Sequence, residues 1–184
     1  PILDVRNLQT HFFTKGGVLK AVDGVSFEIG AGEIVGLVGE SGSGKSITGF
    51  SILGLVDAPG RIVGGEILFK GKDLKTLPVA EMQKMRGSSI AMIFQDPMMT
   101  LNPVLRIETQ MIEAIQTHDS SVSKDEARQR SRDALGLVGI SSPEERMRAY
   151  PHQFSGGMRQ RVSIAIAMLN LSLIHISEPT RPTP

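Results

Sequence analysis

The feature that most constrains the fold is a glycine-rich octapeptide, Gly39 to Ser46, which matches the pattern G-x-x-x-x-G-K-S/T throughout. The preceding run, Ile34 to Val38, is continuously apolar and rich in β-branched residues, as is typical of a strand buried on both faces of a parallel sheet. Residues Ser46 to Leu55 follow with a helical pattern, and their apolar members are available to a core: Ile47, Phe50, Ile52 and Leu53. The order of strand, glycine loop and helix predicts an α/β domain built around this loop.

The residue types in the loop suit the binding of a phosphate chain. Gly39, Gly42 and Gly44 allow the backbone to turn tightly and to bring its N–H groups close to phosphate oxygens. The N-terminus of the following helix offers unpaired N–H groups and a positive dipole end to the same anion. Lys45 would contact the β- and γ-phosphates, and the Ser46 hydroxyl would ligate Mg²⁺. The predicted cofactors are therefore ATP and Mg²⁺, and the predicted nucleotide-binding residues here are Gly39, Glu40, Ser41, Gly42, Ser43, Gly44, Lys45, Ser46 and Ile47.

The rest of the chain divides into a strand-rich first half and a helical second half. Strands are predicted at Val22–Ile29, Gly64–Phe69 and Ser89–Phe94. From about residue 107 the pattern becomes helical, with an apolar face made by Met111, Ile112 and Ile115. Ser123 and Glu126 form a capping-box pattern that opens a helix over Lys124–Leu137, and Ser155 caps another helix that runs to Leu169 with the stripe Val162, Ile166 and Leu169. The fold class expected is a P-loop NTPase core with a mixed sheet and a helical subdomain.

Composition excludes several classes of protein. Apolar residues make up 40% and charged residues 21%, and the formal charge of +1 gives no sign of a nucleic-acid-binding surface. The chain has no cysteine, so disulfides, thiolate metal sites and cysteine nucleophiles are all absent. No apolar run approaches the ~18–20 residues that a spanning helix requires. If the protein serves a membrane, we expect it to do so as a peripheral partner.

Two later segments narrow the class. Phe94-Gln95-Asp96-Pro97 follows a predicted strand, and Phe154-Ser155-Gly156-Gly157-Met158-Arg159-Gln160-Arg161 opens a predicted helix. Taken alone, Gln95 fits a surface glutamine, and Ser155-Gly156-Gly157 fits a helix cap with two permissive glycines. In this order behind a P-loop, they resemble the ATP-binding subunits of ABC transporters, and the resemblance runs from about Ile2 to Asn170.

The resemblance implies a role for each motif. Gly39–Ser46 is similar to the Walker A loop. Gln95 is similar to the Q-loop glutamine, which in the family reaches the Mg²⁺ and the attacking water and lies where the membrane subunits dock; it is thus the candidate catalytic residue and, with Ser46, a candidate metal contact. The segment Ser155, Gly156, Gly157 and Met158 resembles the LSGGQ signature, with Phe154 for Leu and Met158 for Gln. In the family, this signature closes over the ATP that another subunit holds.

An aromatic residue upstream of the Walker A loop stacks on adenine in this family. Phe12 is the candidate and Phe13 the alternative, because both lie at about the right distance before the loop. Adjacent side chains in a strand point to opposite faces, so only one of the two can serve. The remaining alternative places both rings in the core.

The residues within and next to these motifs indicate a subgroup of the ABC transporter ATP-binding subunits. Four segments resemble those of dipeptide and oligopeptide importers: the octapeptide, Ile93–Met98, Leu101-Asn102-Pro103 and Tyr150–Arg161. Nickel and glutathione importers share much of the same sequence in these segments. The resemblance implies a second ATPase subunit, a paralogue, that completes a composite ATP site. It also implies two membrane permease subunits, an extracellular substrate-binding protein and a peripheral position on the cytoplasmic face of the inner or plasma membrane.

The C-terminal residues depart from the family. There a strand ends in Asp-Glu-Pro-Thr, in which the Asp orients the Mg²⁺ shell and the Glu is the general base. Here Ser177 stands in place of the Asp before Glu178, about one residue early. Residues 171–181 also resemble the translation of a transposase adaptor used in sequencing-library preparation. We therefore expect a nucleotide-binding domain over 1–170, with a sheet-rich core to about 100 and a helical subdomain over about 101–165, followed by a non-native tail over 171–184.

These departures set the functional expectation. The parent protein is expected to be an ATPase that powers peptide import, whereas this chain, a fragment without the Asp-Glu pair, is expected to be inactive and of marginal stability. Two alternatives remain open: an ABC-type ATPase that acts on nucleic acid or ribosomes, and a nucleotide binder without turnover.

Overall fold

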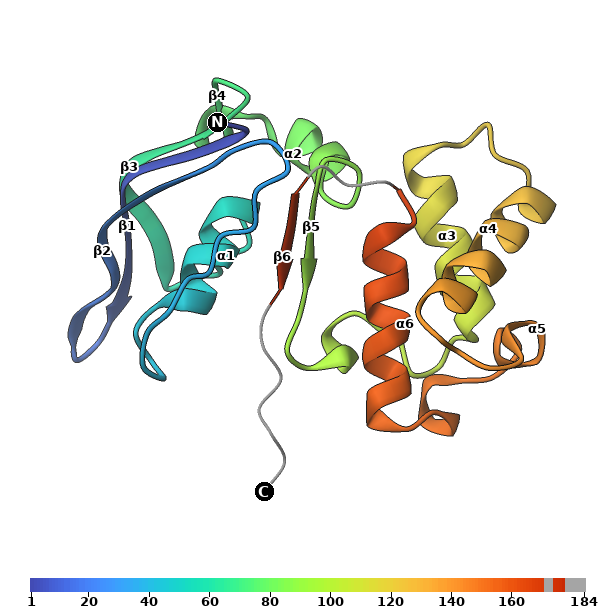
Figure 1. Cartoon of the computed structure of the whole chain (residues 1–184). Coiled ribbons are helices and arrows are strands. Elements are labelled where there is room, and N and C mark those ends of the chain that lie inside the picture. Colours follow the sequence, from blue (N-terminus) through green and yellow to red (C-terminus); the bar gives the residue numbers. More distant parts are fainter. Residues whose placement is uncertain (171–173, 178–184) are drawn as a thin grey trace. The chain divides into compact units, whose positions relative to one another are not determined.

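The computed structural model describes residues 1–170 and 174–177, and it divides into two compact units, Pro1–Gln83 and the part from Lys84 onward. Figure 1 shows the elements of both units along the chain. The suspected non-native tail falls mostly outside the described residues, since only 174–177 of it is placed. The domain boundary expected near residue 100 stays a prediction, and the two units are described separately below.

The first unit is built on an antiparallel sheet with the strand order β2-β1-β3-β4. Strand β1 (Leu3–Thr14) pairs with β2 (Gly17–Ile29) on one side and with β3 (Gly60–Phe69) on the other. The short β4 (Lys72–Asp73) extends β3 as a hairpin, and a 3₁₀ turn follows at Leu74–Thr76. The strands predicted at Val22–Ile29 and Gly64–Phe69 are both present and are longer than the sequence pattern indicated.

Helix α1 (Lys45–Leu53) packs in the first unit, and its position links the glycine loop to the sheet. The Oγ1 of Thr10 on β1 lies 2.7 Å from the Oγ of Ser51 on α1, and both residues are buried. The apolar core of the sheet includes Leu3, Leu8 and Ile67, each fully buried. Helix α1 ends at Leu53, two residues before the predicted end at Leu55, and its cap Gly54 adopts the left-handed conformation that favours glycine.

The strand predicted at Ile34–Val38 is absent, so this expectation was wrong for the structure. Residues 34–38 lie in irregular backbone, and Ile34 and Val38 are 98% and 94% exposed. A buried parallel strand is stabilised by hydrogen bonds to neighbouring strands and by side chains that cover both its faces. Neither sheet of the described residues includes this segment as a strand. Residues 34–38 lack these neighbouring strands, so their apolar character alone does not make them a strand.

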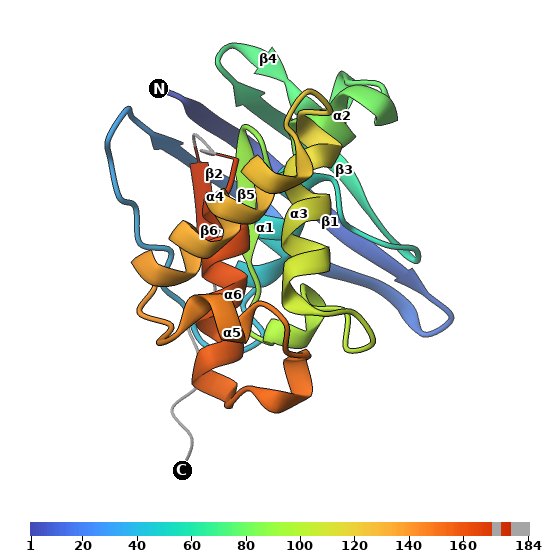
Figure 2. The same ribbon diagram turned by 90° about the vertical axis from the view of Figure 1, so that its right-hand side faces the viewer.

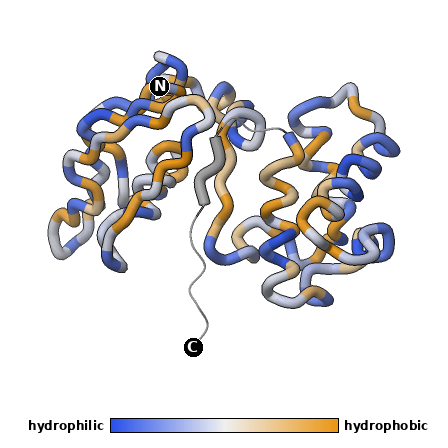
Figure 3. The backbone as a smooth tube through the Cα atoms, in the orientation of Figure 1, coloured by the Kyte–Doolittle hydropathy of each residue, from blue (hydrophilic) through white to orange (hydrophobic). Residues whose placement is uncertain are grey.

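The second unit contains a parallel pair of strands and a group of helices. Strand β5 (Ile90–Ile93) pairs in parallel with β6 (Ile174–Ser177), and β5 is hydrophobic along its length (Figure 3). Helix α2 (Val79–Met85) begins before the division at Gln83 and ends after it. The remaining helices are α3 (Ile107–His118), α4 (Lys124–Leu137), the short α5 (Pro143–Arg146) and α6 (Gly156–Met168).

The helices predicted for this unit are present, and α6 ends at Met168, one residue before the predicted end at Leu169. Helix α4 has the predicted bounds, and the Ser123 side chain accepts a hydrogen bond from the Glu126 N–H at 3.1 Å. The predicted apolar face of α3 is buried, with Met111 fully so. Figure 2 shows α3, α4 and α6 side by side around a core that Leu135 and Val162 help to form. None of the described helices is long and apolar enough to cross a membrane.

Candidate functional site

The glycine loop lies between irregular backbone and the first turn of α1. Gly42 and Gly44 have φ angles of 81° and 92°, a region that L side chains rarely adopt. A Cβ atom on Gly44 would collide with the backbone carbonyl oxygen of Ala21. Gly44 is therefore fixed by two independent requirements, its conformation and its close approach to β2, and the loop turns into the helix as the sequence pattern predicts.

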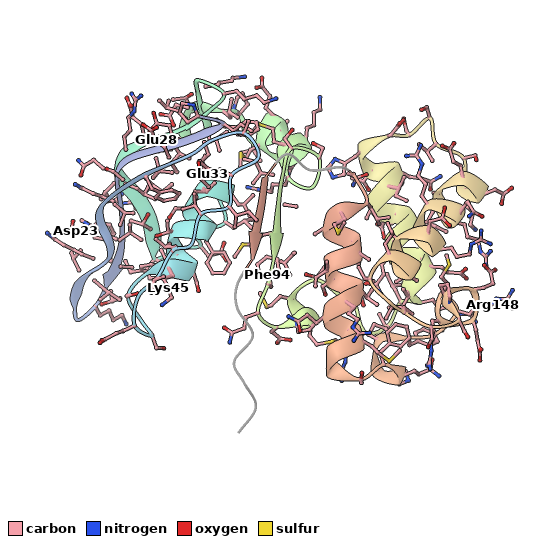
Figure 4. All side chains as sticks on the ribbon, in the orientation of Figure 1. Asp23, Glu28, Glu33, Lys45, Phe94 and Arg148 are labelled. Carbon is pink, nitrogen blue, oxygen red and sulfur yellow. The ribbon has the colours of Figure 1, made fainter. Side chains whose placement is uncertain are left out.

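Lys45 is folded back onto the loop. Its ammonium group donates hydrogen bonds to the carbonyl oxygens of Gly39 at 2.7 Å and Glu40 at 2.6 Å, and to the Ser43 Oγ at 3.3 Å. Figure 4 shows Lys45 at the start of α1. These contacts hold a positive charge inside the turn, where it can face a phosphate chain.

The N-terminus of α1 is open toward an anion. Its cap, Gly44, has no side chain to satisfy the first N–H groups, and the first turn contains no acidic residue. Ser46 is exposed, and so is the loop from Gly39 to Ser43. A helix N-terminus with free N–H groups and a positive dipole end attracts phosphate. The residues present thus fit the triphosphate of a nucleotide.

The two candidate aromatic residues, Phe12 and Phe13, have different neighbours. The ring of Phe12 lies so close to Gly60 that a Cβ there would stand 2.6 Å from its Cε1. Phe13 is 39% exposed and carries the guanidinium of Arg61 over its ring, 4.3 Å from the centroid. Arg61 therefore covers one face of Phe13. Which ring stacks on adenine stays a prediction, with Phe12 as the candidate.

In the second unit, Gln95 is exposed and follows the end of β5. Phe94, the residue before it, is labelled in Figure 4. The next residue, Asp96, caps the 3₁₀ turn Pro97–Met99, because its side chain accepts a hydrogen bond from the Met98 N–H at 2.9 Å. The sequence reading did not identify this cap, although Asp before Pro is a recognisable turn signal.

The signature segment forms the N-terminus of α6. Ser155 is the cap, and its Oγ accepts a hydrogen bond from the Met158 N–H at 3.2 Å. Gly156 and Gly157 are exposed, whereas Phe154 is 3% exposed and packs into the helical core. The buried ring anchors the segment, and the capped helix end is exposed and therefore accessible to an anion.

An ion-pair network that sequence reasoning missed supports this unit. Arg128 on α4 contacts Glu108 on α3 at 3.2 Å and Glu144 on α5 at 2.6 Å. The hydrogen bonds to Glu144 and Glu108 raise the pKa of Arg128, and Arg128 in turn lowers the pKa of Glu144. The partners are separated by 16 to 20 residues, so no local pattern could have indicated them.

The structure places the predicted site residues in both units. The loop from Gly39 to Ile47 and Phe12 belong to the first unit, and Gln95 and Ser155–Met158 belong to the second. Within the second unit, the turn after Gln95 packs against α6. No group of His, Cys, Asp and Glu among the described residues has the geometry of a metal site.

Comparison with known proteins places this arrangement in a family. A family model described as "ABC transporter" matches residues 22–181. The oligopeptide transport ATP-binding protein AppD of Bacillus subtilis (strain 168) is 51% identical over 181 residues, which cover 97% of this chain and 55% of AppD. The dipeptide transport ATP-binding protein DppD of Escherichia coli (strain K12) is 44% identical over 180 residues, with the same shares covered.

Solved structures give the same result. The dimeric structure of MJ0796, a bacterial ABC transporter cassette, matches with a TM-score of 0.84 and 27% identity over 95% of this chain and 72% of that one. A post-hydrolysis state of that cassette, bound to ADP and Pi, matches equally well.

The fold and the glycine loop define an ABC-type ATPase cassette with a mixed α/β architecture. The chain belongs to the ABC transporter family. It spans about half the length of the curated relatives it matches, with 55%, 54% and 50% of three of them covered.

Proposed function

We propose that this chain is the nucleotide-binding part of an ATP-binding subunit of a peptide importer. The observation that carries the proposal is the loop at α1, where Lys45 is held at the carbonyls of Gly39 and Glu40 beside an open helix N-terminus. Relatives named for oligopeptide and dipeptide transport, at 44–51% identity, support peptides as the substrate class.

ATP and Mg²⁺ are the proposed cofactors. The residues of the loop and the first turn of α1 would hold the phosphates, and Phe12 would stack on the base. Ser46 and Gln95 would contact Mg²⁺, which would neutralise phosphate charge when bound. The signature residues Ser155–Met158 would present their N–H groups to the γ-phosphate of a nucleotide bound by another cassette, a proposal that the dimeric structure of MJ0796 supports.

We further propose that the chain binds nucleotide without turnover. The parallel partner of β5 ends at Ser177, whose hydroxyl is a weaker ligand and base than the carboxylate of the family's Asp. Glu178, the following carboxylate, lies outside the described residues. Among the described residues, the end of this strand offers no carboxylate to act as the general base for the attacking water.

The partners proposed are those of a complete importer: a second ATPase subunit, two membrane permeases and an extracellular substrate-binding protein. The chain would act as a peripheral subunit at the cytoplasmic face of the membrane. The neutral charge balance supports this reading over an ATPase that acts on nucleic acid or ribosomes, since such partners favour a strongly basic surface.

Titration calorimetry of the purified chain with MgATP, together with a phosphate-release assay, tests both proposals. We expect binding that Lys45→Ala weakens by about tenfold or more, because a charged hydrogen bond contributes about 1.5–3 kcal/mol. Lys15→Ala, an exposed lysine in the β1–β2 turn, is the matched control and should bind as the parent does. Equal affinity in the parent and Lys45→Ala would contradict the nucleotide site, and Lys45-dependent phosphate release would contradict the absence of turnover.

A further inference from the structure

Arg159 connects the signature helix to the turn that follows Gln95. It lies one turn into α6, where its N–H donates to the Ser155 carbonyl oxygen at 2.9 Å. Its Nη1 lies 3.9 Å from the Sδ of Met98, within the 3₁₀ turn Pro97–Met99. A single side chain on the signature helix therefore contacts a residue only three positions after Gln95.

The bonding of Arg159 is unusually weak for a guanidinium. A thioether sulfur is a poor hydrogen-bond acceptor and carries no charge. The Nε of Arg159 is buried and has no hydrogen-bond partner in the described part of the chain. By contrast, Arg161 on the same helix donates to the carbonyl oxygen of Gly139 at 3.2 Å. A buried donor without an acceptor costs free energy, so the packing of Arg159 calls for an explanation beyond stability.

Hydrogen bonds and a buried residue hold the turn at both of its ends. Asp96 caps it, Met99 donates to the Asp96 carbonyl at 3.1 Å, and Leu101 donates to the Pro97 carbonyl at 3.0 Å. Leu101 is 2% exposed and belongs to the helical core. Gln95, at the near end, is exposed. The contact with Arg159 is thus placed where it can set the position of the turn next to Gln95.

We propose that Arg159 is a positioning residue that holds the turn after Gln95 against the signature helix through Met98. Its meaning for the nucleotide site rests on the proposed function, because that function gives Gln95 and Ser155–Met158 their roles at the nucleotide. The weak sulfur acceptor makes the link easy to release, since any oxygen acceptor offered to the guanidinium would compete well with it. The position of Gln95 and the orientation of the signature helix would then change together.

The experiment uses the whole chain without nucleotide, labelled with ¹³C at the methionine methyl groups, and Met98→Leu assigns the Met98 signal. We expect Arg159→Met to shift that signal and to make the amides of Met99 and Leu101 exchange at least about threefold faster, as local opening requires. Amides of α3 and α4 should keep their exchange rates. Met98→Gln, which offers an amide oxygen to Arg159, should slow exchange in the same turn.

Arg161→Met is the matched control, because it removes the same group from the same helix, and it should leave the turn unchanged. Arg159→Lys, which keeps a charge on a long stem, is the second variant if Arg159→Met does not fold, and it should give an intermediate effect. Unchanged turn exchange in the Arg159 variants, or equal acceleration in Arg161→Met, would overturn the proposal. MgATP affinity is measured in parallel on the parent chain alone, so that a failure of nucleotide binding there counts against the proposed function and not against the link between Arg159 and Met98.

Discussion

The ammonium group of Lys45 lies 2.6 Å from the carbonyl oxygen of Glu40, within the glycine loop that leads into α1. A second carbonyl, that of Gly39, accepts from the same group at 2.7 Å. The lysine is thus held by the loop backbone, so the charge is in place before a phosphate arrives. Binding then loses little side-chain entropy, which is the advantage of preorganisation.

This arrangement predicts that arginine cannot replace Lys45. A guanidinium is planar and larger, and it cannot place one compact donor group between two carbonyl oxygens. We expect Lys45→Arg to weaken MgATP binding by about tenfold or more, the effect of one lost charged hydrogen bond. Calorimetry measures the change, and Lys15→Arg is the control. Parent-like affinity in Lys45→Arg would show that charge alone, without the lysine geometry, is sufficient.

The glycines of the loop should differ in their tolerance of a methyl group. Gly44→Ala faces both a positive φ and the carbonyl of Ala21, whereas a Cβ on Gly42 has a positive φ but meets nothing within 4 Å. A positive φ costs about 1–2 kcal/mol for an L residue. We therefore expect Gly42→Ala to lower the free energy of unfolding by about this amount, and Gly44→Ala to lower it further. Urea denaturation followed by circular dichroism provides the comparison, and equal losses would contradict the collision at Ala21.

Substitution of Phe12 and substitution of Phe13 should have different effects on the affinity for the adenine base. If Phe12 stacks on adenine, Phe12→Ala should lower the affinity for ATP by roughly 5- to 150-fold, since a stacked base contributes about 1–3 kcal/mol. Its affinity for inorganic tripolyphosphate should not change. Phe13→Ala, which removes the platform of Arg61, should leave both affinities as they are. A selective loss of ATP affinity in Phe13→Ala instead would assign the base to the other ring.

The signature cap predicts a measurable loss of stability. Ser155→Ala removes the oxygen that accepts from the Met158 N–H, and we expect it to lower the free energy of unfolding by about 1 kcal/mol. Ser155→Asp keeps an acceptor and favours the helix N-terminus, so it should retain parent stability. Urea midpoints of the three proteins test this. If Ser155→Ala and Ser155→Asp lose the same stability, the cap does not stabilise α6.

Local patterns explain which parts of the fold could be predicted from the sequence. The bounds of α4 follow from the Ser123 cap and from residues that are all adjacent along the chain. The N-terminus of α6 follows in the same way from Ser155. The glycine loop was predictable because its left-handed glycines and the start of its helix lie within one octapeptide, although the close approach of Gly44 to Ala21 does not.

Features that depend on distant partners could not be predicted. The run Ile34–Val38 reads as a buried strand, but a strand needs neighbours, and apolar residues do not specify them. The bonds of Arg128 to Glu108 and Glu144, and the contact of Arg159 with Met98 across 61 positions, arise from the packing of helices. Sequence periodicity predicts the faces of such helices but not which side chains meet.

The Arg128 network predicts how stability depends on pH. The hydrogen bond from Arg128 lowers the pKa of Glu144 in the folded state below the ordinary value of 4.5. A carboxyl group with a lowered folded pKa stabilises the fold above its unfolded pKa, and this contribution is lost as the pH falls through the folded pKa. The stabilisation from Glu144 should therefore be fully present at pH 7 and disappear progressively below about pH 4.5.

Urea midpoints measured between pH 7 and pH 3 check this dependence. Glu144→Gln should be less stable than the parent at pH 7, and the difference should shrink toward zero as the pH falls below about 4.5. Glu145→Gln is the matched control, because it removes the same charge from the neighbouring position of α5, where no ion pair to Arg128 exists. A Glu144→Gln deficit that stays constant down to pH 3 would show that Glu144 acts through packing, since only the ionised carboxylate can pair with Arg128.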